Sequence, residues 1–143
     1  MYLAYQTHLQ WRADALMAGQ YEDLARHTAT PIDVWLQDRC MRMNRRDDVL
    51  LQLHRLRVAL TAKGVTRLTA RVVAVELPQR TRRVWVHLDE ILGDGATGDR
   101  ADVIYHMQGA EGWMRTVGVE YRTLLVPELA RPSFRERLAR SRG

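Results

Sequence analysis

Apolar side chains in the first part of the chain recur at the spacing of helices. Residues 4–18 predict a helix through apolar positions three or four residues apart, namely Leu9, Ala13, Leu16 and Met17. Gly19 ends this repeat, and residues 20–27 predict a second, short helix. The helical pattern stops before Pro31, because the residue that precedes a proline disfavours the α conformation.

Two short strands and a third helix follow. Alternation of apolar and polar side chains predicts a strand through Ile32, Val34 and Leu36, and residues 40–43 predict another. Asn44, followed by the acidic Asp47 and Asp48, predicts the start of a helix, since such residues stabilise the free amides of a first turn. Gly64 predicts its end.

The chain then changes to extended segments rich in Val, Ile, Trp, Tyr and Thr. Four strands are predicted, at residues 65–77, 82–92, 101–108 and 113–125. A turn at 78–81, a glycine-rich loop at 93–99 and a turn at 109–112 separate them. Helices followed by hairpin-connected strands predict an α+β fold, with an antiparallel sheet packed by the N-terminal helices.

Composition predicts one soluble domain with a charged end. A length of 143 residues suits a single domain, which we place at residues 1–130. Residues 131–143 hold five arginines against one glutamate, and so most of the net charge of +5. We expect this segment to be a basic, mobile tail.

The rest of the composition indicates which partners and which cellular compartment to expect. Lys63 is the only lysine among 22 basic residues, a bias that points to genome composition more than to phosphate binding, so we do not expect nucleic acid as a partner. Apolar runs reach four or five residues, far short of the roughly 20 that span a bilayer, so no membrane association is expected. The single Cys40 cannot form an internal disulfide, which fits a cytoplasmic location.

The order of these segments resembles the nuclear transport factor 2-like superfamily, and its SnoaL-like branch in particular. The matching residues are Leu9, Trp11, Ala18, Gly19, Tyr21, Glu22, Asp23 and Leu24 at the start, residues 31–36 and 44–49, and Glu111-Gly112-Trp113 in the last turn. Together they cover about residues 5–125. One departure is Arg115, which stands where an apolar side chain is common in that family.

The resemblance implies a curved sheet wrapped around helices into a cone with an internal pocket, usually dimeric through the sheet faces. Family members include ketosteroid isomerases, dehydratases, polyketide cyclases and non-enzymatic association domains. The resemblance therefore implies a shape and a pocket, whereas function depends on the residues that line it.

Turn positions predict which side chains face the pocket. A turn at residues 78–81 predicts an apolar, helix-covered row of Val73, Val75, Leu77, Val84, Val86 and Leu88. A turn at Ala110-Glu111 pairs His106 with Arg115 on the same side of the sheet. A slip of one residue would move both side chains to the opposite face.

His106 and Arg115 are the leading ligand-binding candidates, because a few polar groups in an apolar hollow are typical of ligand pockets. Arg115 would bind a carboxylate or carbonyl of the ligand, or else a carboxylate of Asp14 or Glu22. The alternative is that His106 and Arg115 form a solvated or interface pair.

Trp11, Trp35 and Asp33 are further ligand-binding candidates. The tryptophans could equally supply buried area in the core. Asp33 could equally be an ordinary neighbour of a turn. The histidines have no metal-ligand spacing, so neither a metal nor another cofactor is expected, and no catalytic residue is assigned.

Two functions follow from these features. The first is binding of a small organic ligand, which extends to a metal-independent isomerase, cyclase or dehydratase that acts by acid–base chemistry. The second is a non-enzymatic, dimeric protein-association module. In either case we expect a twofold homodimer through the outer sheet face, predicted to carry Val72, Trp85, His87 and Tyr105.

Overall fold

The structure is a computed structural model and describes residues 2–76, 81–110 and 112–123. Its elements are α1 (Tyr2–Met17), α2 (Tyr21–Arg26), β1 (Thr28–Leu36), β2 (Arg39–Met43), α3 (Arg46–Ala62), β3 (Val65–Val75), β4 (Arg82–Leu92), β5 (Thr97–Ala110) and β6 (Trp113–Tyr121). The strands form one sheet in the order β2-β1-β6-β5-β4-β3. Only the β1–β6 pair among these neighbours is parallel. The predicted α+β class is therefore confirmed, with a mixed sheet.

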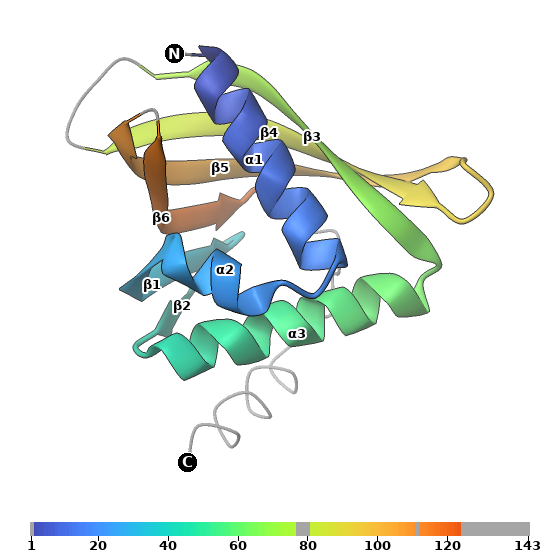
Figure 1. Ribbon diagram of the computed structural model, residues 1–143, viewed down its shortest axis with the longest axis horizontal. Coiled ribbons are helices and arrows are strands. Elements are labelled where there is room, and N and C mark those ends of the chain that lie inside the picture. Colours follow the sequence, from blue (N-terminus) through green and yellow to red (C-terminus); the bar gives the residue numbers. More distant parts are fainter. Residues whose placement is uncertain (1, 77–80, 111, 124–143) are drawn as a thin grey trace.

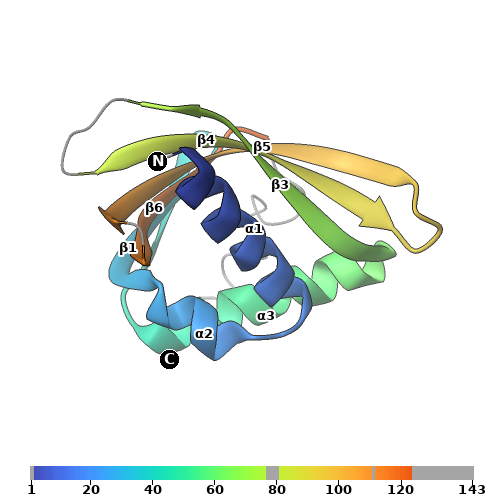
Figure 2. The same ribbon diagram turned by 45° about the horizontal axis from the view of Figure 1, so that its top comes forward.

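The sheet curves around the helices, which all lie on its concave side (Figure 1, Figure 2). Alternate residues of the central strands are buried on this side, namely Val84, Val86 and Leu88 of β4 and Val103, Tyr105 and Met107 of β5. They belong to one apolar core with Leu9 and Leu16 of α1 and Leu56 and Leu60 of α3. None of the described helices is long and apolar enough to cross a membrane.

Helix α1 also covers the free edge of the sheet. Because β3 is the last strand, every second backbone N–H and C=O along it has no neighbouring strand. Gln6 donates to the Ala70 carbonyl at 2.7 Å and accepts from the Val72 N–H at 2.8 Å. Gln10, one helical turn later, makes the same kind of pair. It donates to the Leu68 carbonyl at 3.1 Å and accepts from the Ala70 N–H at 2.8 Å.

The spacing of the two glutamines explains this match. Four residues of helix rise about 6 Å, and two residues of strand rise about 6.6 Å. A pair of side chains one helical turn apart therefore meets consecutive edge-facing residues of β3. Gln6 and Gln10 bond to β3 much as a further strand would.

A bulge in β3 changes the predicted faces. Val75 pairs with Val84 as predicted, but Val86 pairs with Val72 instead of Val73. Val73 is the extra residue, and it is 41% exposed, whereas Val72 is buried on the inner face. The predicted inner row is thus correct on β4 and wrong for Val73.

Three further predicted segments are the glycine-rich loop, the turn at residues 78–81 and the basic tail. β5 begins at Thr97, so the predicted loop at residues 93–99 is a shorter turn, closed by a bond from the Leu92 N–H to the Ala96 carbonyl at 2.8 Å. The predicted turn at 78–81 falls outside the described residues except for Thr81, and so does the predicted basic tail at residues 131–143.

We expect Gln6→Leu to lower the free energy of unfolding by about 1–3 kcal/mol, because it leaves an N–H and a C=O of β3 without partners. Urea denaturation measures this change, and amide exchange at Val72 should accelerate. Gln108→Leu is the matched control, since among the described residues the Gln108 side chain is bonded to the Arg115 side chain, and it should cost less than about 0.5 kcal/mol. Equal stability of Gln6→Leu and the parent would contradict this role of α1.

Candidate functional site

The concave side of the sheet encloses a cavity of about 90 Å³, here called the inner cavity. Most of its lining is aliphatic, including Leu16, Leu24, Val34, Leu56, Leu68 and Val119. Five polar side chains also line it, namely Arg12, Thr28, Gln52, Tyr105 and Tyr121. No aspartate or glutamate is among the described residues that line it.

Arg12 brings a positive charge into this apolar space. Burial lowers the pKa of its guanidinium, but an arginine stays protonated at neutral pH. Its hydrogen bond is a long one, donated to the Thr28 hydroxyl at 3.4 Å. Within the described part of the chain no carboxylate forms an ion pair with Arg12. Arg12 is partly buried, so its charge is partly desolvated, and an acceptor in the cavity would compensate that cost.

Two tyrosines and a glutamine complete the polar part of the inner cavity. Burial raises the pKa of Tyr105 and of Tyr121 and outweighs the opposite effect of the Arg12 charge, so both remain neutral hydroxyls. The side-chain oxygen of Gln52, on α3, is buried and has no hydrogen-bond partner among the described residues. The cavity thus offers a cation, neutral hydroxyls and an unpaired amide oxygen between apolar walls. Such a set suits a small ligand with at least one oxygen.

A second, more open hollow of about 570 Å³ lies beside α1 at the start of β6. We call it the aromatic cleft, after His8, Trp11, His27 and Trp113 in its wall. The His27 Nδ1–H donates to the Met114 carbonyl at 2.7 Å. Burial, aided by the charges of Arg12 and His27, lowers the pKa of His8 to about 4.

The predicted pair of His106 and Arg115 is wrong. Gln108, not His106, lies opposite Arg115, and an extra residue in β6 places His106 opposite Gly118. Arg115 is exposed and donates to the Gln108 side chain at 3.1 Å. Neither His106 nor Arg115 lines the inner cavity.

The other predicted ligand-binding residues also lie away from the inner cavity. Asp33 and Trp35 point to the outer face of β1, where Asp33 forms an ion pair with Arg42 at 3.7 Å. The Trp35 ring stacks on His106 with centroids 5.7 Å apart. Trp11 lies in the aromatic cleft. The predicted candidates are therefore distributed over two faces of the molecule and do not form one site.

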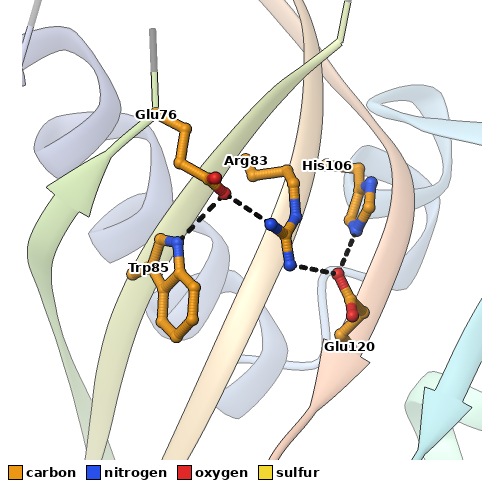
Figure 3. A network of polar contacts seen from close by, with 5 residues as sticks. All are labelled: Glu76, Arg83, Trp85, His106 and Glu120. Atoms are coloured by element: carbon orange, nitrogen blue, oxygen red, sulfur yellow. Dashed lines mark hydrogen bonds and ion pairs between the residues drawn. The ribbon is translucent and has the colours of Figure 1, made fainter.

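His106 belongs to a polar network on the outer face of the sheet (Figure 3). Arg83 bridges the carboxylates of Glu76 at 2.8 Å and Glu120 at 3.3 Å. Trp85 donates to Glu76 at 3.2 Å, and His106 contacts Glu120 at 2.5 Å. These groups satisfy one another, so this part of the outer face is a closed network within one chain.

The predicted dimer face is also changed by the observed register. Val72 and Tyr105, which we expected on the outer face, are buried on the inner one. Trp85 remains outside, with the guanidinium carbon of Arg83 at 5.7 Å and that of Arg122 at 5.3 Å from its ring centroid. The outer face is therefore less apolar than its sequence suggested.

Arg12 is the residue that reasoning from sequence missed. A signal for it was present, because Arg12 stands three residues after Leu9 and four before Leu16, at the edge of the apolar stripe of the first helix. The described residues gather no group of three or more His, Cys, Asp or Glu side chains that could hold a metal ion.

Solved structures place this architecture among known folds. An NTF2-like protein with a cystatin-like fold from Novosphingobium aromaticivorans has a TM-score of 0.64 at 13% identity, over 92% of this chain and 84% of that one. A domain of unknown function with a cystatin-like fold from Nostoc punctiforme has a TM-score of 0.63 at 16% identity, over 96% and 91%. This chain has the nuclear transport factor 2-like fold.

A structure from Catenulispora acidiphila in complex with S-DNPA is similar as well, with a TM-score of 0.59 at 16% identity, over 84% of this chain and 92% of that one. No family profile matches the sequence, and no curated protein matches it. At these identities the likeness extends to the fold, so any function has to be argued from the residues of the cavity and the cleft.

The outer network predicts a pH-dependent stability. Burial alone would raise the pKa of Glu120, but the bond and charge of His106, with the charge of Arg83, outweigh it and hold that pKa below its ordinary value of 4.5. A carboxyl group whose pKa is lower in the folded protein than in the unfolded chain stabilises the fold at pH values above its unfolded pKa. This stabilisation is lost as the pH falls through its folded pKa.

We therefore expect Glu120→Gln to be less stable than the parent at about pH 7, with a smaller difference at about pH 3, where protonation of Glu120 begins to remove the contribution of its charge. Urea denaturation at both pH values measures it. The same difference at both would show that the charge of Glu120 contributes nothing.

Proposed function

We propose that this protein binds a small, largely apolar molecule in the inner cavity and holds an anionic or electron-rich oxygen of that molecule at Arg12. The observation that supports this most directly is the guanidinium in an apolar cavity whose described lining has no carboxylate. A carboxylate or enolate oxygen would accept charge-assisted hydrogen bonds from it, and these are the strongest ones available to a protein.

Two further observations support a ligand over a structural role for Arg12. The unpaired oxygen of Gln52 would accept a bond from a ligand hydroxyl or amide. A structural arginine at this depth would be expected to pair with an acid of its own chain, as Arg83 does outside with Glu76 and Glu120. A similarly folded protein is found in complex with S-DNPA, which supports the proposal of a bound compound.

The narrower form of the proposal is an isomerase, cyclase or dehydratase that acts by acid–base chemistry. A fixed cation and neutral hydroxyls stabilise negative charge that develops on an oxygen, which is a large part of catalysis at carbonyl groups. His8 stands one helical turn from Arg12, and its low pKa keeps it unprotonated at neutral pH, as a proton acceptor must be.

Substitution of Arg12 tests the ligand site. We expect Arg12→Met to be as stable as the parent or more stable, because it removes a desolvated charge, and to lose the rise in melting temperature that butanoate gives the parent. Thermal unfolding with increasing butanoate measures both effects. The matched control is Arg115→Met, which removes an exposed arginine and should keep the full response. Loss of the response in Arg115→Met, with Arg12→Met unaffected, would place the ligand elsewhere.

The alternative function is a non-enzymatic, dimeric association module. It is favoured by the outer face, where Trp35 is partly exposed beside the network of Arg83 and Glu120. A twofold dimer through this face would cover the tryptophan and exclude water from the ion pairs.

For this dimer we expect light scattering at micromolar concentration to give twice the chain mass of 16.6 kDa. Trp35→Glu should reduce the value to that of one chain, since it places a charge at the contact. A parent protein that already has the mass of one chain would contradict the dimer.

A further inference from the structure

The aromatic cleft brings together four rings from three parts of the chain. His8 and Trp11 lie on α1, His27 follows α2, and Trp113 begins β6. Ring centroids lie 5.5 Å apart for His8 and His27, 5.0 Å for Trp11 and His27, and 4.3 Å for His27 and Trp113. Trp113 is 54% exposed, so a large aromatic surface borders an open hollow. Such a surface favours stacking of a flat, unsaturated ring.

The polar atoms of the cleft also point to a ligand. The His27 Nδ1–H is used by the Met114 carbonyl, so this ring is fixed in place. The Nε2 atom of His8 is buried and has no hydrogen-bond partner among the described residues. His8 is also uncharged at neutral pH, because burial and the nearby charges lower its pKa to about 4. The uncharged ring of His8 and the fixed ring of His27 are therefore suited to contact a flat ring in the cleft.

Some residues that line the cleft are neighbours, along the chain, of residues that line the inner cavity. His8 and Arg12 are one helical turn apart, a rise of about 6 Å, and His27 precedes Thr28 directly. His8 and His27 line the cleft, whereas Arg12 and Thr28 line the inner cavity. The 3.4 Å contact between Arg12 and Thr28 thus joins two residues whose neighbours on α1 and after α2 line the cleft.

The sizes of the hollows differ in a way that matters for the ligand. The inner cavity holds about 90 Å³, whereas ligand pockets usually have roughly 300–1,000 Å³. A ligand anchored at Arg12 must therefore either be very small or extend into an adjoining space. The cleft, with about 570 Å³, is large enough for a fused ring system.

We propose that the aromatic cleft is a second subsite of the same ligand and takes a flat aromatic ring, so that the ligand class is an aryl carboxylate whose carboxylate reaches Arg12. This inference rests on the proposed function, since it uses Arg12 as the anchor. Stacking on Trp113 contributes affinity beyond the ion pair, and it distinguishes a ring-bearing acid from an aliphatic one.

Calorimetric titration of the full chain with 2-naphthoate and with butanoate tests the subsite. Butanoate is small enough to bind at Arg12 alone, whereas 2-naphthoate would reach both places. We expect Trp113→Ala to weaken 2-naphthoate binding about five- to tenfold and to leave butanoate binding unchanged. The matched control is Trp35→Ala, which removes another partly exposed tryptophan, on the outer face, and should change neither affinity.

The outcomes separate the two proposals. Unchanged 2-naphthoate affinity in Trp113→Ala, or an equal loss in Trp35→Ala, overturns the subsite while the anchor at Arg12 stands. Failure of both carboxylates to bind the parent overturns the anchor and the subsite together. Loss of both ligands in Arg12→Met, combined with the selective loss in Trp113→Ala, supports both.

Discussion

The free edge of β3 is the constraint on which the arrangement of the site depends. Its backbone groups need partners, and Gln6 and Gln10 supply them from one side of α1. At about 100° per residue, the apolar stripe of α1 lies next to these glutamines, and His8 and Arg12 lie on the far side of that stripe. The bonds to β3 thereby fix the rotation of α1 about its own axis. The direction in which Arg12 and His8 point follows from that rotation.

The network on the outer face and the inner cavity differ in whether their charged side chains are paired. On the outer face Arg83 of the network in Figure 3 is paired with the carboxylates of Glu76 and Glu120, so the charges of this network are paired within the chain. Among the described residues that line the inner cavity, Arg12 is the one charged side chain, and the others are aliphatic or neutral polar groups. Charges that are paired within the chain fit a structural role, whereas the charge of Arg12 has no carboxylate partner among the described residues, and the proposed ligand site depends on this difference. This contrast carries more weight than the shape of the cavity, since many proteins of this fold share a concave sheet.

The order of helices and strands could be predicted from the sequence because periodicity and turn residues are local signals. The register of the strands could not be predicted, because two single-residue irregularities displace the predicted pairs. Val73 continues a run of valines, and nothing in that run marks it as a bulge. The shift near Val117 moved His106 away from Arg115 in the same way. Arg12 was missed for another reason, because a lone arginine in a helix usually points to solvent.

The protonation states around the inner cavity have a consequence for how binding responds to acid and base. Burial keeps Tyr105 and Tyr121 protonated above their ordinary range, and Arg12 keeps its charge despite a lowered pKa. His8 titrates only near about 4. Between roughly pH 5 and pH 9 none of these four groups changes its charge. They present a fixed electrostatic environment, so none of the four would change the affinity for a carboxylate ligand in this interval.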